Sequence, residues 1–197
     1  MLFQKKSGAV DWLVVGLGNP GMSYEGTRHN AGCTALDVLA KDAGVTLDKK
    51  QFKALTATAV IEGQKVLLLF PQTFMNLSGE AVQAAMAFYK LSPAQLLVFS
   101  DDIALDVGGV RVRKKGSDGG QKGLRDIIAR VGTDEFPRIR IGVGKKPHPA
   151  YDLADWVLSK YKKDELPLMA EAFDKAAAAA RLVIAGKIDE AMNKYSH

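Results

Sequence analysis

One histidine stands where it could act as a general base. The chain has three histidines, of which His197 is the final residue and His148 lies between two prolines of a basic stretch. His29 instead follows a cluster of glycines and precedes a helical pattern. A neutral imidazole that is oriented by a carboxylate can remove a proton from water near neutral pH. The alternative is a histidine that only packs or caps at the start of the helix, and both interpretations remain open.

Residues with acid or amide groups follow the apolar runs of the sequence. Asp101 and Asp102 come directly after a short apolar stretch, and Asn19 follows another. Ligands of α/β sheets bind beyond the carboxyl ends of the strands, so Asn19, Asp101 and the loop that holds Asn76 are candidates for one rim. Capping is the ordinary alternative for such residues. We assign it to Asp102, and either Asn76 or Ser78 could cap the helix that follows.

The sequence lacks the patterns of a covalent or a metal-dependent hydrolase. It contains no Gly-x-Ser-x-Gly motif, and one cysteine with three scattered histidines gives no zinc-binding spacing. These absences leave a water molecule activated by His29 as the favoured chemistry. The single cysteine, Cys33, cannot form an internal disulfide, which fits a reducing cytoplasm. We expect it to be a buried structural thiol.

A motif in the same region points to a different class of protein. Gly16-x-Gly18-x-x-Gly21 matches the dinucleotide-binding fingerprint, and Asp37 lies near the spacing expected of its ribose-binding acid. In that fingerprint the glycines open directly into a helix, whereas here Pro20 and a polar bridge intervene. Asp37 also falls inside a helical pattern instead of at the end of a second strand. The sequence therefore disfavours a nicotinamide enzyme.

The apolar patterns predict strands that alternate with helices. We expect strands at 12–15, 52–60, 65–70, 96–99, 110–113 and 138–143, and helices at 31–43, around 82–89, 124–131, 152–161 and 165–184, with a terminal turn after residue 186. The second and third strands should form a hairpin whose second member is the more buried. This order predicts a single α/β domain over residues 1–197, with a mixed, mostly parallel twisted sheet flanked by helices on both faces. Residues 1–10 are expected to form a loosely ordered N-terminal extension.

The charge distribution indicates a polyanionic partner. The chain carries a net charge of +5, but the stretch 111–146 alone has eleven Lys and Arg against four Asp and Glu. A basic region of this kind suits the phosphate backbone of a nucleic acid. No apolar run approaches the ~20 residues needed to cross a bilayer, and the N-terminus lacks the apolar core of a secretory signal. We therefore expect a cytoplasmic protein without a membrane segment.

Several short motifs together resemble those of bacterial peptidyl-tRNA hydrolases. They are Gly-Leu-Gly-Asn-Pro-Gly at 16–21, Tyr24, Thr-Arg-His-Asn at 27–30, Phe-Met-Asn at 74–76, Asp-Asp at 101–102 and Gly-Gly-x-x-Gly at 119–123. They occur in the family's order over nearly the whole chain. The resemblance implies hydrolysis of the ester between a peptide and the terminal ribose of tRNA, which recycles tRNA from prematurely released chains. It also implies a single α/β domain and no metal or other cofactor, and we expect a monomer.

The resemblance assigns roles to residues of the cleft. By position in the motifs, His29 matches the family's catalytic base and Asp101 the acid that orients it. Asn19 and Asn76 match amides that line the peptide-binding cleft, and both belong to the expected catalytic set. Two neighbouring substrate-binding positions are matched by Tyr24 and Met75.

The basic stretch supplies the expected tRNA contacts. Arg113 and Arg140 fall at positions similar to basic residues that contact tRNA phosphates in the family. Lys145 and Lys146 lie near another such position. Contacts of this kind are electrostatic and largely independent of base sequence, which suits an enzyme that accepts many tRNAs.

The chain departs from the family pattern at one place. After Gly119-Gly120 the family usually has His-Asn, whereas this chain has Gln121-Lys122. We expect Gln121 to take over the amide role and Lys122 to bind a phosphate or the 3′ end of the substrate. One alternative is that both are solvated loop residues. Another is an RNA-binding relative with little hydrolytic activity, against which the retained histidine, aspartate and two asparagines of the cleft argue.

Overall fold

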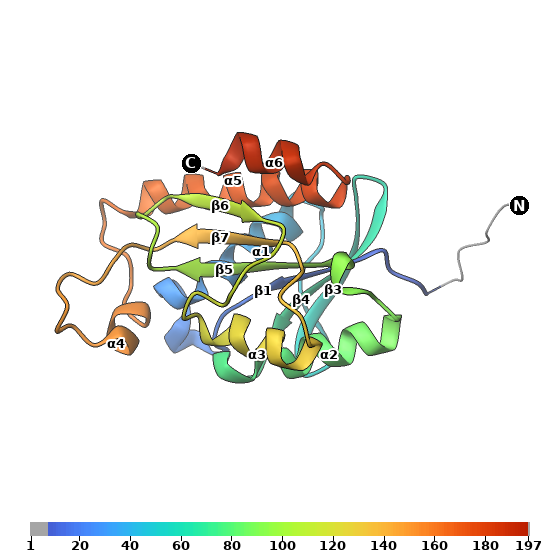
Figure 1. The fold of residues 1–197 in the computed structure, drawn as a ribbon, viewed down its shortest axis with the longest axis horizontal. Helices are drawn as coiled ribbons and strands as arrows, with labels where there is room; N and C mark the ends of the chain where they lie inside the picture. The colour runs from blue at the N-terminus through green and yellow to red at the C-terminus, as the bar shows by residue number, and fades with distance from the viewer. Residues whose placement is uncertain (1–7, 197) are drawn as a thin grey trace, which may run out of the picture.

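The computed structural model describes residues 8–196, and its strands form a seven-stranded sheet between two layers of helices (Figure 1). The strands are β1 (Trp12–Gly16), β2 (Lys49–Gln51), β3 (Ala54–Ile61), β4 (Gln64–Pro71), β5 (Leu96–Asp102), β6 (Val110–Arg113) and β7 (Arg138–Gly142). Their order in the sheet is β2-β3-β4-β1-β5-β7-β6. The central strands β4, β1, β5 and β7 run parallel, and the strands at both edges join antiparallel.

The central strands are apolar because helices cover both faces of the sheet. Leu13, Val14 and Val15 of β1 are fully buried. β3 and β4 form the predicted hairpin, and β4 is the more buried of the two, as expected. The short edge strand β2 was not predicted. Phe52 and Lys53 join it to β3, both at positive φ (53° and 54°), so β3 begins two residues later than expected.

Helices cover the two faces of the sheet in two sets. α1 (Ala31–Asp42), α5 (Leu166–Ile184) and α6 (Ile188–Tyr195) pack on one face, and α2 (Ser78–Tyr89) and α3 (Lys122–Val131) pack on the other. α4 (Leu153–Val157) lies beyond the carboxyl ends of β5 and β7 (Figure 1). Short 3₁₀ helices are η1 (Met22–Tyr24), η2 (Arg28–Asn30), η3 (Met75–Leu77) and η4 (Pro93–Gln95).

Four helices differ from the sequence predictions, among them α2, which begins at Ser78 ahead of the expected range around 82–89. α3 begins two residues earlier because Gln121 caps its first turn, and α6 occupies the region predicted as a terminal turn. The helix predicted over 152–161 is only five residues long. It ends early because the residues after it pair with the chain before α1, where the backbone N–H of Arg28 donates to the carbonyl oxygen of Ser159 at 3.0 Å.

Gly32 allows the first turn of α1 to approach the ends of β1 and β5. A Cβ at this position would collide with the backbone of Leu17 and Phe99. His29 lies three residues earlier on η2, so this close approach holds it near the carboxyl end of β5, where Asp101 lies.

Most of the predicted N-terminal extension, residues 1–7, lies outside the described residues, as does residue 197. Val10, at the end of that extension, is buried in the core. Within residues 8–196, no helix is both long and apolar enough to span a membrane.

Candidate active site

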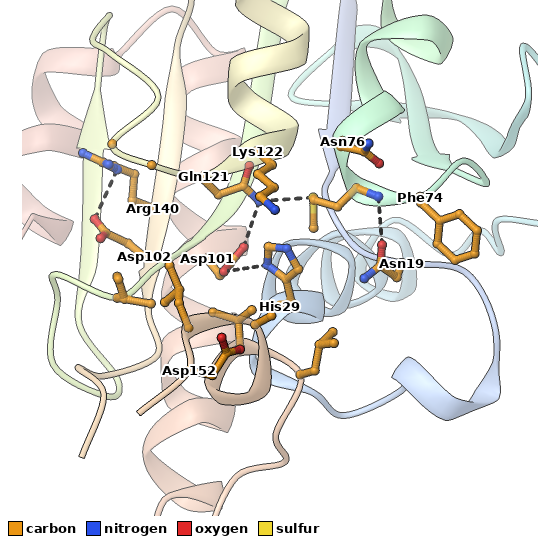
Figure 2. A pocket seen from close by; sticks show the side chains of 18 residues that line it. Asn19, His29, Phe74, Asn76, Asp101, Asp102, Gln121, Lys122, Arg140 and Asp152 are labelled. Carbon is orange, nitrogen blue, oxygen red and sulfur yellow. Dashed lines mark hydrogen bonds and ion pairs between the residues drawn. The ribbon is translucent and has the colours of Figure 1, made fainter. Parts of the chain in front are cut away.

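A cavity of about 610 Å³ lies at the carboxyl ends of the parallel strands, with α4 along one side (Figure 2). Many residues that the sequence predicted as site residues line it: Asn19, His29, Met75, Asn76, Asp101, Gln121, Lys122 and Arg140. The fold therefore brings most of the predicted site together from stretches that are far apart in the sequence.

His29 and Asp101 form a hydrogen-bonded pair in this cavity. The Nδ1 of His29 lies 2.9 Å from the Oδ2 of Asp101. An ionised carboxylate only accepts hydrogen bonds, so Nδ1 donates and Nε2 is the unprotonated nitrogen of the neutral ring. Asp101 is 4% exposed and the His29 side chain 12%, which keeps the pair largely out of bulk solvent. This arrangement leaves Nε2 free to act as a general base.

Opposing effects set the protonation of His29. Burial of the ring lowers the pKa of His29, and the positive charge of Lys122 lowers it as well. The charge of Asp101 and the hydrogen bond to it act in the opposite direction, and together they prevail. The pKa of His29 therefore lies above its ordinary value of 6.5, and the ring becomes an available base only above that raised pKa.

Gln121 holds the second oxygen of Asp101. Its Nε2 donates to the Oδ1 of Asp101 at 3.0 Å and also contacts the Sδ of Met75 at 3.2 Å. Its Oε1 accepts the backbone N–H of Leu124 at 2.7 Å and so caps α3. Gln121 is 8% exposed, so its alternative interpretation as a solvated loop residue is wrong. A direct contact of this amide with substrate stays a prediction.

Asn19 is fixed through both its backbone and its side chain. Its N–H donates to the Oδ1 of Asn30, and its carbonyl oxygen accepts from the Nδ2 of Asn30, each at 2.9 Å. The Oδ1 of Asn19 accepts the backbone N–H of Met75 at 2.8 Å. The amide nitrogen of Asn19 remains as a donor on the side of the cavity where His29 lies (Figure 2).

Asn76 and Lys122 also line the cavity. Asn76 is exposed and does not cap α2, which starts without a side-chain cap. Ser78 donates to the carbonyl oxygen of Met75 instead. The capping interpretation of Asn76 and Ser78 is therefore wrong. The ammonium group of Lys122, on the first residue of α3, is close enough to His29 to lower the pKa of the ring.

Arg140 forms a basic edge of the cavity. Its Nε lies 3.1 Å from the Oδ2 of Asp102 in an ion pair. The other oxygen of Asp102 accepts the N–H of Ala104 at 2.8 Å, so the capping role assigned to Asp102 is confirmed. A Cβ at Gly119 would collide with the guanidinium of Arg140. The glycine loop before α3 therefore rests directly on this arginine.

Four arginines of β6 and β7 share one face of the sheet. In the strand register Arg111 pairs with Arg140, and Arg113 pairs with Arg138. Arg138 is 1% exposed and donates to backbone oxygens of neighbouring loops, so it supports the fold. Burial lowers the pKa of Arg113, and the charges of Arg111 and Arg140 lower it further. An anion bound beside these side chains would relieve their mutual repulsion.

Tyr24, Arg113 and Lys145 lie outside the lining of the cavity. Tyr24 packs against Phe74, with 6.4 Å between ring centroids, and Phe74 itself lines the cavity. Arg113 lies on the edge strand β6, and Lys145 is exposed in the loop after β7. Their contacts with a substrate stay predictions.

The sequence interpretation missed one wall of the cavity. It consists of α4 and its flanking residues, namely Asp152, Leu153, Ala154, Val157 and Leu158. Leu153 and Leu158 are 42% and 39% exposed although both are apolar. The sequence predicted a helix that starts at Asp152, and in the structure the Oδ1 of Asp152 accepts the N–H of Asp155 at this helix start. That prediction gives a helix start and no information on its distance from His29.

None of the residues that line the cavity is a serine, threonine or cysteine. Within residues 8–196, no group of three or more His, Cys, Asp or Glu could hold a metal ion. Cys33 is buried, and burial raises the pKa of its thiol to about 12, which fits the predicted structural role. The α/β fold and this cavity define a protein in which a histidine–carboxylate pair can activate water beside a basic edge.

Comparison with known proteins identifies the family. The family model described as peptidyl-tRNA hydrolase matches residues 13–197. A peptidyl-tRNA hydrolase of Alkaliphilus metalliredigens is 47% identical over 186 residues, which cover 94% of this chain and 99% of that protein. One of Caldicellulosiruptor bescii is 48% identical over 184 residues, which cover 93% and 96%. The chain belongs to the peptidyl-tRNA hydrolase family.

Solved structures of peptidyl-tRNA hydrolases have the same fold. The crystal structure of the protein from Acinetobacter baumannii matches with a TM-score of 0.88 at 37% identity, over 96% of this chain and 97% of that one. A complex of a peptidyl-tRNA hydrolase with n-propanol matches with a TM-score of 0.87 at 39% identity, over 94% of each chain. The predicted α/β fold with a mixed sheet is confirmed.

Proposed function

We propose that this protein hydrolyses the ester bond between a peptide, or an N-blocked amino acid, and the terminal ribose of peptidyl-tRNA, and so recycles tRNA from prematurely released chains. The observation that carries the proposal is the pair of His29 and Asp101, 2.9 Å apart, in a cavity that also holds amide donors and a basic edge. Membership of the peptidyl-tRNA hydrolase family supports the same substrate.

The proposed reaction uses water as the nucleophile. The Nε2 of neutral His29 takes a proton from a water molecule while the water oxygen attacks the ester carbonyl. Asp101 accepts the Nδ1–H throughout and stabilises the imidazolium that forms. The proton then passes to the ribose 3′ oxygen as its bond to the carbonyl carbon breaks. A general base of this kind contributes roughly 10²- to 10⁴-fold, enough to matter for an activated ester.

Donors in the cavity can stabilise the negative charge that develops on the carbonyl oxygen. The amide groups of Asn19 and Asn76 reach the same cavity as His29, and we assign both to the oxyanion and the ester. One such donor is typically worth about 10²- to 10³-fold in kcat. Lys122, as a compact cation at the start of α3, is assigned to the anionic 3′ end of the tRNA.

The two parts of the substrate fit different parts of the cavity and its surroundings. Arg140, with Arg113 and Lys145 further out, offers positive charge to the phosphates of the tRNA. The α4 wall and Phe74 offer apolar surface to the acyl group. We also propose that the protein acts as a monomer. We propose further that it acts in the cytoplasm, where a protein with a single cysteine and no internal disulfide is at home.

The test is incubation of the purified protein with a labelled peptidyl-tRNA, with and without a chelator. We expect release of deacylated tRNA at the same rate in both samples. A rate that falls with the chelator would contradict a reaction without metal. Binding of tRNA without hydrolysis would instead indicate an RNA-binding relative of the family.

A further inference from the structure

Arg28 is 1% exposed and bonds to three groups that come later in the chain. Its Nη1 donates to the backbone oxygen of Val143 at 2.8 Å, its Nε to the Oγ of Ser159 at 3.1 Å, and its Nη2 to the carboxylate of Glu165 at 2.7 Å. The guanidinium also stacks on Trp156, 3.8 Å from the ring centroid. Each of the three nitrogens of the guanidinium therefore donates a hydrogen bond, and the carboxylate of Glu165 balances its positive charge.

These contacts close a long segment of chain at both of its ends. Val143 directly follows β7 and Glu165 directly precedes α5, so one guanidinium bonds to the start and the end of segment 143–165. Inside the segment, the Nε1 of Trp156 donates to the carbonyl oxygen of Gly144 at 2.9 Å. The segment is therefore a loop that is folded over this arginine.

The same segment carries the apolar wall of the cavity. Leu153, Val157 and Leu158 line the cavity from α4 and its end. Trp156 lies on the same short helix and is buried against Arg28, so the arginine supports this wall from behind. Arg28 is also the residue before His29, which lines the cavity directly.

We propose that Arg28 is a positioning residue that fixes the α4 wall relative to His29 and thereby sets which acyl groups fit beside the reacting ester. The inference rests on the proposed function for the identity of the substrate. A guanidinium suits this task because it donates in several directions and presents a flat face to Trp156. Lysine has a single charged point and can replace only part of these contacts.

The kinetic test uses two substrates on the same tRNA, an N-acetylphenylalanyl and an N-acetylglycyl ester. Only the phenylalanyl side chain has a large apolar surface to pack on the α4 wall. In Arg28→Lys we expect the KM of the phenylalanyl ester to rise about tenfold and that of the glycyl ester by less than about twofold. The kcat and its pH profile should stay unchanged for both. Equal losses on both esters, or a lower kcat with a displaced pH profile, would overturn the proposal.

Two further variants sharpen this test. Arg138→Lys is the matched control, because Arg138 is equally buried and also donates to backbone oxygens, but of other loops. Arg138→Lys should leave the ratio of the KM of the phenylalanyl ester to that of the glycyl ester unchanged. A change in this ratio as large as the one in Arg28→Lys would overturn the role of Arg28. Ser159→Ala removes one bond to the guanidinium and should shift the ratio in the same direction by a smaller factor. An unchanged ratio in Ser159→Ala, should Arg28→Lys fail to fold, would also overturn it.

A spectroscopic measurement separates this inference from the proposed function. Trp12→Phe leaves Trp156 as the only tryptophan of the chain. In the Trp12→Phe protein, Arg28→Lys should expose the indole ring of Trp156, so that acrylamide quenches its fluorescence more strongly. Unchanged quenching would contradict the positioning role of Arg28. Wild-type protein that hydrolyses neither ester would contradict the proposed function, whatever the quenching shows.

Discussion

Gln121 donates a hydrogen bond of 3.0 Å from its Nε2 to the Oδ1 of Asp101, whose other oxygen accepts from His29. The aspartate is thus held at both oxygens, which fixes its direction toward the imidazole. The same glutamine caps α3 through its Oε1. One side chain therefore serves the helix and the histidine–aspartate pair, and substitutions can separate these two roles.

Gln121→Ala should lower kcat about tenfold, because Asp101 loses one of its two partners, while KM changes little. It should also cost about 1 kcal/mol of stability through the lost cap. Gln121→Ser is the matched variant, since serine caps helices well but is too short to reach Asp101. Steady-state kinetics and thermal unfolding should show that serine restores the stability and not the kcat. A full recovery of kcat in Gln121→Ser would reduce Gln121 to a helix cap.

Asp101→Asn should move the acid limb of the pH profile of kcat/KM to lower pH. The charge of Asp101 and its hydrogen bond keep the pKa of His29 above 6.5 against the effect of burial, so their removal lets that pKa fall. The plateau should also fall about 10- to 100-fold, since the base survives but is poorly oriented. A pH–rate profile with the wild-type limb would show that this pairing does not control His29.

Lys122→Gln should move the acid limb of the pH profile of kcat/KM to higher pH. The charge of Lys122 lowers the pKa of His29, so its removal raises that pKa further and the activity appears at higher pH. We also expect a higher KM at low salt that converges on the wild-type value at high salt. Lys145→Gln makes the same charge change in an exposed loop outside the cavity, so it should leave the limb in place. Identical pH profiles for the wild type, Lys122→Gln and Lys145→Gln would show that Lys122 does not act on His29.

Arg140→Ala should raise KM for tRNA substrates and flatten the salt dependence of binding by about one phosphate contact. Arg113→Ala should act in the same direction. A short ester without the tRNA body should react with both variants as with the wild type. Equal losses on the short ester would mean that these arginines support the fold and not the partner.

Gly119→Ala should raise KM for tRNA as Arg140→Ala does, but by less, although Arg140 itself is kept. The reason is that a methyl group at position 119 would displace the guanidinium of Arg140. Gly120→Ala is its control. Both glycines have positive φ (59° and 86°), so alanine is strained at either, but only Gly119 abuts Arg140. The two variants should have similar stability, and only Gly119→Ala should raise KM for tRNA. The same KM in both variants would exclude this role of the loop.

The layers of the fold could be predicted from local patterns, whereas the pairing of His29 with Asp101 was implied by the family resemblance. An apolar strand leads into Asp101, and a glycine-rich turn delivers His29 to the start of a helix. The rule that ligands bind beyond the carboxyl ends of parallel strands placed Asn19, Asp101 and the loop of Asn76 at one edge, but it did not place His29.

The rest depends on contacts between residues that are distant in the sequence. From the sequence of its glycine-rich loop, the amide of Gln121 could only be expected to contact substrate or solvent. In the structure it bonds to Asp101, twenty residues earlier. The bond between Arg28 and Glu165 spans 137 residues, and the same guanidinium stacks on Trp156 of α4. No periodicity reports such a contact, so the α4 wall was missed although its helix was predicted.

The central claim, that His29 is the general base of an esterase acting on peptidyl-tRNA, is tested most directly by the His29→Ala variant. Single-turnover hydrolysis of an N-acetylated aminoacyl-tRNA and tRNA binding should be measured on the same preparation. The hydrolysis rate should fall by at least about 100-fold, because the base is lost. The Kd for tRNA should stay within about twofold, because His29 does not meet the phosphates. Hydrolysis at the wild-type rate, or a loss of binding as large as the loss of hydrolysis, would contradict the claim.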